Sequence, residues 1–313
     1  MKIIGAGMAG LLAANVLRRH KPVVYEAKTS LPDNHAALLR FRSEAISRAT
    51  GIPFKQVRIH KAIVDPNGRV TNETNLRLNN MYAQKVVGRI MGRSSTNLDP
   101  ADRWIAPPDF VSQMAKCVDI RFGESVDLTN YKPEFGPCIS TMPMPELMRQ
   151  LEWEAIPQFK FSPVWVVNAQ IIDPEVDVYQ TIYFPDPAIP IYRASITGNN
   201  VIMEFVDDPH KSSTDTDRSM VMRWIHHFGI CPRQIKQVGD GITVMRYGKI
   251  SPIDDLTRRN FIYNASQACH IYSLGRFATW RQILLDDLIG DIQFIESFIL
   301  QRDLYRAQKS IIG

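Results

Sequence analysis

The first 26 residues carry two apolar runs separated by a helical spacing. Residues 2–4 form a short apolar run that ends at Gly5, and residues 8–19 place small and aliphatic side chains at helical intervals. Residues 22–26, PVVYE, form a second apolar run of the kind found in strands buried within a parallel sheet. The pattern predicts a strand, a tight turn, a helix and a second strand, which together begin an α/β domain.

The rest of the chain changes its pattern several times. Residues 159–206 alternate apolar and polar positions and are rich in β-branched and aromatic side chains, which predicts an antiparallel sheet. Residues 118–127 also read as strands, residues 136–151 predict a strand, a turn and a helix, and residues 35–51 predict a helix. Residues 270–309 predict a strand and a glycine turn followed by a long amphipathic helix.

Composition limits the class of protein and of ligand. The 313 residues suffice for two domains, or for one sheet with a large insertion, and the 45% hydrophobic and 22% charged contents are those of a soluble globular protein. A net charge of +5, with no basic run interleaved with aromatics, favours an anionic small ligand over nucleic acid.

The cysteines and the hydropathy indicate where such a protein works. The four cysteines show no ligand spacing, so they predict no metal site and are most simply thiols of a reducing compartment: Cys117, Cys138, Cys231 and Cys269. There is no signal sequence and no apolar stretch of about 18 residues, so we expect a cytoplasmic protein with no membrane partner.

The turn after the first strand has the spacing of a dinucleotide-binding site. Gly5 permits the turn, Gly7 lets a pyrophosphate approach the backbone, and Gly10 lets the helix pack against the strand. The start of the helix offers free N–H groups, and Glu26 at the end of the second strand can accept hydrogen bonds from ribose hydroxyls, which favours FAD or NAD over NADP. The alternative is a glycine-rich turn in an ordinary α/β protein.

Two later segments, in combination with GAGMAG, resemble one family. YFPDPAIPIYRASITGN at 183–199 and IYSLGRFATWR at 271–281 are similar to segments of the UDP-galactopyranose mutases, which belong to the amine-oxidase-like FAD group. The resemblance implies an α/β fold with a Rossmann-like FAD-binding domain (GR2-type), an antiparallel-sheet substrate region and a small helical or irregular lid. The implied FAD-binding domain is discontinuous, over 1–60, 116–150 and 251–313, with a lid at 61–115 and the sheet domain at 151–250.

The family's activity implies a redox-neutral isomerase. In this family N5 of reduced FAD attacks the anomeric carbon of UDP-galactopyranose and expels UDP, and the sugar recloses as UDP-galactofuranose. The implied partners are a UDP-sugar and a reductant such as NAD(P)H, although no second glycine fingerprint exists to seat a nicotinamide. The oligomeric state stays open, a homodimer included. In keeping with a cofactor that supplies the reactive atom, the sequence offers no Ser/His/Asp or Cys/His set of its own.

The resemblance also implies the site residues. Arg193 matches an arginine that grips the substrate diphosphate, Tyr183 a tyrosine that donates to the same group, and Arg276 an arginine beside the flavin, so Arg193 and Arg276 are the implied catalytic residues. Further substrate contacts are expected at Tyr192, Gln282, Trp104 and Arg103. The implied cofactor contacts are Gly5, Ala6, Gly7, Met8, Ala9, Gly10, Glu26, Ala27, Lys28, Val126, Gly275, Arg276, Trp280, Leu284 and Leu285.

The sequence departs from the family at two places. Gln282 stands where the family usually has a tyrosine that touches substrate phosphate, and LPDNHAALLRF at 31–41 replaces a Gly-Gly loop beside the flavin. The chain is also short for the family, so the lid is expected to be reduced, with residues 81–110 as its candidate and Arg89, Arg93, Arg103 and Trp104 as its phosphate or uracil contacts.

Other interpretations of the same residues stay open. The chain could be an FAD-dependent oxidase or desaturase, or a catalytically idle nucleotide-binding homologue. Arg193 could be a surface arginine of a sheet, Tyr183 a core aromatic and Arg276 a partner of the final helix. His226 and His227 indicate the end of a surface helix, and Asp286 and Asp287 the acidic first turn of a helix.

Overall fold

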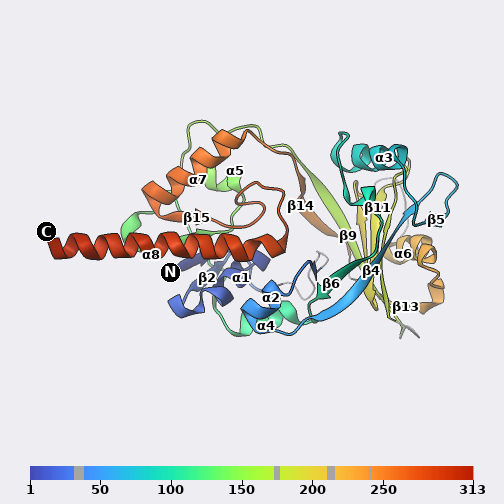
Figure 1. The fold of residues 1–313 in the computed structure, drawn as a ribbon, viewed down its shortest axis with the longest axis horizontal. Helices are drawn as coiled ribbons and strands as arrows, with labels where there is room; N and C mark the ends of the chain where they lie inside the picture. Colours follow the sequence, from blue (N-terminus) through green and yellow to red (C-terminus); the bar gives the residue numbers. More distant parts are fainter. Residues whose placement is uncertain (32–38, 173–176, 210–215, 240, 313) are drawn as a thin grey trace.

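The computed structural model describes residues 1–31, 39–172, 177–209, 216–239 and 241–312, with side chains described up to 304. The chain forms two lobes that are joined by long strands (Figure 1). The glycine turn and both termini belong to the first lobe, and a large curved sheet forms the second. The segment 31–41, which replaces the Gly-Gly loop, lies mostly outside the described residues.

The first lobe is built on a parallel sheet covered on both faces. Among the described residues it has five strands in the order β15-β8-β1-β2-β7, all pairs parallel. Ile3, Ile139 and Leu274 pack on one face with helices α1, α2, α4 and α8, while Ile4, Cys138 and Ile271 pack on the other with α5 and α7. Burial on both faces explains the continuous apolar runs of its strands. The strands are β1 (Lys2–Ile4), β2 (Val23–Glu26), β7 (Asp119–Phe122), β8 (Cys138–Ser140) and β15 (Ile271–Ser273).

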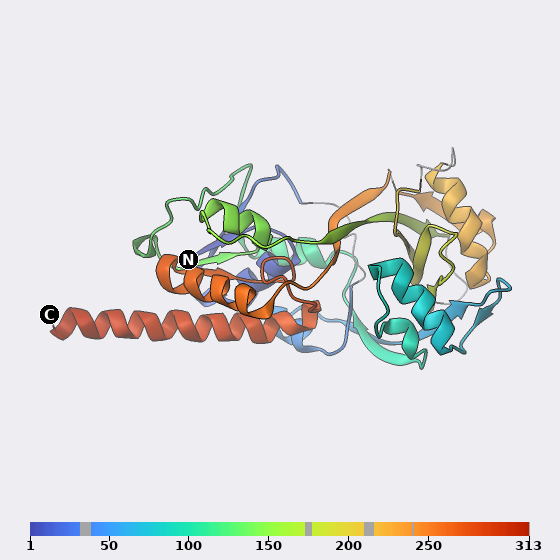
Figure 2. The ribbon, with the colours of Figure 1, turned by 90° about the horizontal axis from the view of Figure 1, so that it is seen from above.

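Three helices of this lobe, α1, α5 and α8, lie where the sequence predicts them and α2 lies in the second part of 35–51, whereas α4 and α7 were not predicted. The helices are α1 (Met8–Val16), α2 (Ala45–Thr50), α4 (Phe110–Lys116), α5 (Met144–Gln150), α7 (Asp255–Cys269) and α8 (Leu288–Ile312). Helix α8 packs through Leu288, Ile292, Ile295 and Ile299 and then extends past the sheet, as Figures 1 and 2 show. The helix predicted over 35–51 is wrong in its first part, because Arg40–Phe41 form strand β3. That short segment pairs with β6 (Ala101–Ile105), so strand pairing overrides its helical spacing.

The second lobe is a mostly antiparallel sheet. Its strands run in the order β13-β9-β12-β11-β10-β4-β6-β3 in the described part of the chain, with β14 added to β9 and β5 to β4. β10 and β4 pair in parallel, and the other pairs are antiparallel. The strands are β3 (Arg40–Phe41), β4 (Lys55–Val64), β5 (Val70–Thr71), β6 (Ala101–Ile105), β9 (Phe161–Ile171), β10 (Val178–Tyr183), β11 (Ile191–Gly198), β12 (Asn200–Phe205), β13 (Ile235–Val238) and β14 (Thr243–Ile250).

Two helices lie against this sheet, α3 (Leu76–Val87) and α6 (Asp217–Ile225), as Figure 1 shows. The segment 61–115, expected to be a lid, therefore also supplies strands β5 and β6 and part of β4 to the sheet. Helix α3 is the part of it that covers a sheet face, through Leu78, Tyr82 and Val86. Within the described residues no helix is both long and apolar enough to cross a bilayer.

Candidate functional site

One face of the large sheet is apolar, and the other carries polar side chains beside an apolar cluster that packs under α3. Side chains alternate between the two faces of a strand, so Ile182, Ala194, Ile196 and Met203 share one face, beneath α6. The positions between them carry a different set on the opposite face: Thr181, Tyr183, Arg193, Ser195, Thr197, Asn200 and Glu204. A buried polar face of this kind is suited to binding a polar ligand between the sheet and the first lobe.

Arg193 and Glu204 form the centre of this polar face. They pair in register across β11 and β12, and both carboxylate oxygens of Glu204 accept from the guanidinium, at Nε and at Nη2, the latter at 2.6 Å. A β-bulge between Ile191 and Arg193 aims Tyr192 at the same carboxylate, and its hydroxyl donates to Oε1 at 2.8 Å. Burial opposes the ionisation of Glu204, but Arg193 lowers the pKa of its carboxyl below the ordinary value.

Tyr183 lies directly opposite Arg193 on β10, so the structure brings these two predicted residues together. The Tyr183 ring is buried and makes an edge contact with Tyr82 of α3, with ring centroids 5.2 Å apart. Burial raises the pKa of Tyr183. Its hydroxyl therefore stays protonated at neutral pH and can donate a hydrogen bond.

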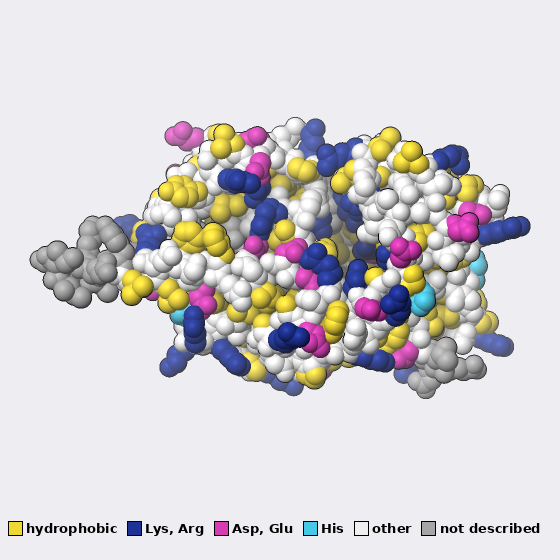
Figure 3. Space-filling model, viewed as in Figure 1, with side chains coloured by type: hydrophobic (Ala, Val, Ile, Leu, Met, Phe, Trp, Pro, Cys, Tyr) yellow, Lys and Arg dark blue, Asp and Glu magenta, His cyan; other side chains and the backbone are white. Residues whose placement is uncertain are grey.

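Further cations gather around Arg193. Lys249 of β14 places its ammonium 4.5 Å from the centroid of the Tyr192 ring, and burial, with Arg193 and Arg93 nearby, lowers the pKa of Lys249 to about 7. Burial lowers the pKa of Arg276 as well, helped by Arg93 and Arg193. Arg193 and Arg276, from different lobes, are thus close enough for the charge of Arg193 to act on Arg276. Basic side chains lie along the junction of the lobes on the face drawn in Figure 3.

Arg40 reaches the same face from strand β3. Its guanidinium donates to the hydroxyls of Thr181, at 2.7 Å, and Thr197, at 2.8 and 3.0 Å, and to the backbone carbonyls of Gln180 and Ile196. Burial, with Arg193 nearby, lowers the pKa of Arg40. We name the set Arg40, Arg93, Arg193, Lys249 and Arg276 the basic cluster. Glu204 is the carboxylate that faces it.

The C-terminal Gly-Arg turn contacts the N-terminal glycine turn. Gly275 has a φ of +98° and approaches so closely that a Cβ added there would lie 3.0 Å from the Cβ of Ala9. The next residue, Arg276, has a buried Nε with no hydrogen-bond partner among the described residues. Its Nη2 lies 3.4 Å from Oε1 of Gln282, which in turn donates to the carbonyl of Ile250. Gln282 therefore supports Arg276 and strand β14.

The three glycines of the turn differ in the space around them: Gly5 and Gly10 have no room for a side chain, whereas Gly7 has free space. Gly5 has a φ of +92°, and a Cβ on Gly10 would come within 1.9 Å of the Gly5 carbonyl oxygen, so neither tolerates a side chain. Gly7 begins α1 with no capping side chain, and a Cβ there would meet nothing within 4 Å. Glu26 accepts from the N–H groups of Ala6, at 2.7 Å, and Lys28, at 3.0 Å, which holds its carboxylate beside the turn.

Several predicted contacts take structural partners. Trp104 and Arg103 are adjacent on β6 and so face opposite ways: Trp104 packs on the first lobe's core, whereas Arg103 lies near enough to Arg40 to influence its pKa. Trp280 is buried between Phe159 and Tyr247 and donates its indole N–H to the Ser251 carbonyl. Trp104 and Arg103 therefore do not face the same side of the strand, and their expected ligand contacts stay predictions.

The start of the final helix is also already capped. The resemblance implied that the N–H of Leu284 would face a flavin carbonyl. In the structure this N–H donates to the Asp287 carboxylate at 2.8 Å. Val126 packs at the edge of the cluster that contains Trp280. Arg89 is exposed, whereas Arg93 is half-buried in the basic cluster. The described residues contain no group of histidine, cysteine or carboxylate side chains that could hold a metal ion.

Sequence reasoning missed three residues of this site: Arg40, Glu204 and Lys249. Glu204 could have been recognised from the sequence, because it is the one charged residue within the apolar run VIMEF of a predicted strand. Lys249 sits two residues before the proline-rich turn of RYGKISP, where its burial could not be read from the sequence. Arg40 lies in a segment predicted to be helical, so its place on the sheet was hidden.

Comparison with solved structures places this architecture among flavoproteins. A reduced UDP-galactopyranose mutase matches with a TM-score of 0.61 at 14% identity, over 95% of this chain and 93% of that one. A putrescine oxidase variant with redesigned cofactor binding matches at 0.57 and 10% identity, over 96% and 98%. Aklavinone-11 hydroxylase in complex with FAD and aklavinone matches at 0.53 and 13%, over 88% and 56%.

The chain has the Rossmann-like α/β fold of FAD-dependent flavoproteins. This confirms the fold class expected from the sequence. At these identities the likeness concerns the fold alone. No family model matches the sequence, and no curated protein matches it either.

Proposed function

We propose that this chain is an FAD-dependent enzyme acting on a diphosphate-bearing substrate, and specifically a UDP-galactopyranose mutase. The observation that carries the proposal is the basic cluster, in which cations from both lobes act on one another around Arg193 and its partner Glu204. Such an excess of positive charge in a partly desolvated site favours an anionic ligand, and a diphosphate is an anion that several cations can share.

The residues around the glycine turn fit FAD. The uncapped first turn of α1, with open space at Gly7, would receive the pyrophosphate, and Glu26 has carboxylate lone pairs left for a ribose hydroxyl. The buried, unpartnered Nε of Arg276 is a donor that lies next to this turn through Gly275. When bound, the flavin would supply the electron-rich reactive centre.

The protein's own side chains would bind and orient the substrate. Glu204 already occupies Nε and Nη2 of Arg193, so Arg193 offers Nη1 and its charge to a phosphate and not an open two-pronged grip. Lys249 and Arg93 would supply the remaining positive charge, and Tyr183 a hydroxyl donor. In this arrangement Glu204 fixes the angle of Arg193, as a positioning residue.

A second candidate function is an FAD-dependent oxidoreductase of the amine-oxidase type, which the similar match to putrescine oxidase supports. The basic cluster bears on this choice. A protonated amine would be repelled by Arg193, Arg276 and Arg93, so an oxidoreductase substrate here would have to be anionic. For either function we propose the same division of the chain into an FAD-binding domain, a lid and a sheet domain.

The visible spectrum followed by turnover tests the proposal. We expect purified protein to be yellow and, after reduction with dithionite, to convert UDP-galactofuranose to UDP-galactopyranose, as read by chromatography. Yellow protein that is bleached by an anionic substrate without added reductant would support the oxidoreductase. Protein that stays colourless after reconstitution with FAD would reject both.

A further inference from the structure

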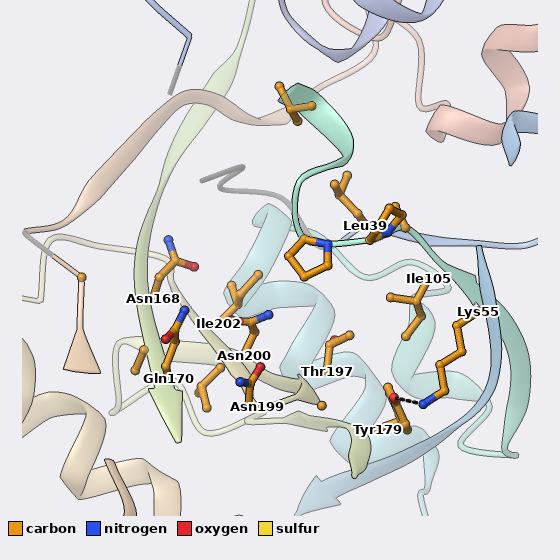
Figure 4. Close-up of a pocket in the computed structure, with 18 of the residues that line it drawn as sticks. Leu39, Lys55, Ile105, Asn168, Gln170, Tyr179, Thr197, Asn199, Asn200 and Ile202 are labelled. Carbon is orange, nitrogen blue, oxygen red and sulfur yellow. Dashed lines mark hydrogen bonds between the residues drawn. The ribbon is translucent and has the colours of Figure 1, made fainter. Parts of the chain in front are cut away.

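A cavity of about 750 Å³ lies beside the basic cluster, on the same polar face of the large sheet. Its floor is formed by β9, β11 and β12, and its opposite wall by the connection from β6 to α4. Figure 4 shows Asn168, Gln170, Asn199 and Asn200 on the floor and Leu39 and Ile105 on the other side. The volume is that of a pocket for a small organic molecule.

Carboxamides dominate the polar lining of this cavity. Asn168, Gln170, Asn200 and Gln237 all line it, and none of their side chains hydrogen-bonds to another residue in the described ranges. Asn168 and Asn200 are only half exposed, although each could make up to four hydrogen bonds. We name the cavity the carboxamide pocket.

The pocket offers no unpaired charge among its described lining. Lys55 is its cation, and the ammonium is held by the Asp177 carboxylate at 2.9 Å and the Tyr179 hydroxyl at 3.1 Å. Amides supply both donors and acceptors, and Ile105 and Ile202 add apolar surface. This combination suits an uncharged ring that bears hydroxyl or carbonyl groups, and it offers little to a free phosphate.

The pocket and the basic cluster are separated by a distance that one ligand can span. Thr197, which lines the pocket, follows Arg193 by four residues on β11, which corresponds to about 13 Å along the strand. Asn200 and Glu204 repeat the same separation on β12. Arg40 lies between the two sites and donates to Thr197 itself.

We propose that the carboxamide pocket binds the uncharged ring of the ligand whose diphosphate lies at the basic cluster, with Asn168 and Asn200 as its main hydrogen-bonding residues. This inference rests on the proposed function for the anion and adds the site of the neutral part. The ring is the nucleoside or the hexose, which share hydroxyl and carbonyl chemistry. The experiment below separates these two sources.

Calorimetric titration with pyrophosphate, UDP and UDP-galactose tests the inference on the full chain. The N168A/N200A variant is compared with wild type and with Q301A, which removes an exposed carboxamide from α8. We expect N168A/N200A to bind pyrophosphate as wild type does, which also shows that it is folded. Two lost hydrogen bonds should weaken binding of the ring-bearing ligand about tenfold.

The pattern of loss identifies the ring. A tenfold loss for UDP as well as UDP-galactose assigns the pocket to the nucleoside, and a loss for UDP-galactose alone assigns it to the hexose. Unchanged ratios of UDP and UDP-galactose affinity to pyrophosphate affinity would overturn the inference.

Neutral probes keep this outcome separate from failure of the proposed function. Uridine and methyl galactoside are examined by saturation-transfer NMR with the same variants. Wild type could fail to bind pyrophosphate but bind a neutral probe whose signal disappears in N168A/N200A. That result would support ring binding in the carboxamide pocket and reject diphosphate binding at the basic cluster. If no probe binds in a pocket-dependent way, the inference is wrong.

Discussion

Glu204 lies directly across the sheet from Arg193 and takes two of its N–H groups with its two carboxylate oxygens. With side chains 10% and 28% exposed, the pair is too buried to be a surface ion pair. We expect E204Q to leave uncompensated positive charge on the polar face. UDP should then bind several-fold tighter, while the free energy of unfolding falls by about 2 kcal/mol. Titration and urea denaturation measure both, with E124Q as the exposed control, and weaker UDP binding would contradict this prediction by showing that the positioning of Arg193 outweighs the removed negative charge.

Removing the arginine should act in the opposite direction on binding. R193A deletes a cation beside a desolvated phosphate and leaves Glu204 to repel the anion, so UDP affinity should fall by about 2 kcal/mol, roughly thirtyfold. The R218A variant, on α6 under the apolar face, is the matched control. Equal affinities for wild type and R193A would leave Arg193 as a structural arginine of the sheet.

Lys249 predicts a pH dependence of ligand binding. Burial, with Arg193 and Arg93, lowers the pKa of Lys249 to about 7, so the ammonium loses its proton as the pH rises through 7. Affinity for UDP-galactose, whose diphosphate diester does not titrate there, should therefore fall between about pH 6 and 8. K249Q should remove this change and K236Q, an exposed lysine of β13, should keep it. A pH profile identical in wild type and K249Q would assign the dependence elsewhere.

The same pKa fixes the sign of a stability effect. Because the unfolded chain keeps the Lys249 proton up to about 10.5, it binds more protons than the folded chain between pH 7 and 10.5. The contribution of Lys249 therefore makes the protein more stable as the pH rises through that window. Below pH 7 both states carry the proton and the cost of burying the charge is fully present. Urea midpoints of wild type and K249Q at pH 6 and 9 should differ most at pH 6.

The glycine turn allows flavin binding to be separated from folding. Gly7 has a φ of −70° and open space around its Cβ position, so G7A should fold normally but should lose FAD, because the methyl group would occupy the approach of the pyrophosphate. In G10A the new Cβ would collide with the Gly5 carbonyl oxygen, so this variant should lose stability as well. The absorbance ratio at 450 and 280 nm and the melting temperature report the two effects. G7A with full flavin content would show that the pyrophosphate does not lie there.

The hydrogen bonds of Arg40 link strand β3 to the polar face, and their contribution to stability can be measured. R40M deletes hydrogen bonds to two hydroxyls and two backbone carbonyls, which should lower the free energy of unfolding by about 2 kcal/mol. The control R58M removes an exposed ion pair with Asp102 and should change stability by no more than about 0.5 kcal/mol. Similar denaturation midpoints for R40M and R58M would show that the hydrogen bonds of Arg40 contribute no net stability.

The sequence predicted elements whose signal is local. The strand ending at Gly5, the helix from Met8 and the alternation of 159–206 each depend on neighbouring residues, and all three are found. Arg40 shows the limit, because its segment has helical spacing, but pairing with β6, sixty residues later, decides its structure. The parallel pairing of β10 with β4 is also long-range and leaves no mark in either strand.

For the site, the motifs located Tyr183, Arg193 and Arg276 but not their partners. The charged partner of Arg193 is set by the register between β11 and β12 and by the bulge at Tyr192. The residues next to Arg193 in the sequence indicate neither feature. The charges that act on Lys249 come from both lobes, Arg193 from the large sheet and Arg276 from the first lobe. Trp104 packs against the core of the first lobe, and strand alternation turns it away from Arg103, which the motifs alone do not indicate.

Strand β9 pairs with β12 along one edge and with β13 and β14 along the other, and β14 continues directly toward α7 of the first lobe. Because β9 follows α5 and β14 precedes α7, the two lobes are joined by two strands that hydrogen-bond to each other, and this pairing should limit the rotation of one lobe against the other. Helix α3 adds no strand to the sheet and is held on it by side chains such as Tyr82 and Lys85, whose ammonium donates to the Phe184 carbonyl at 2.9 Å.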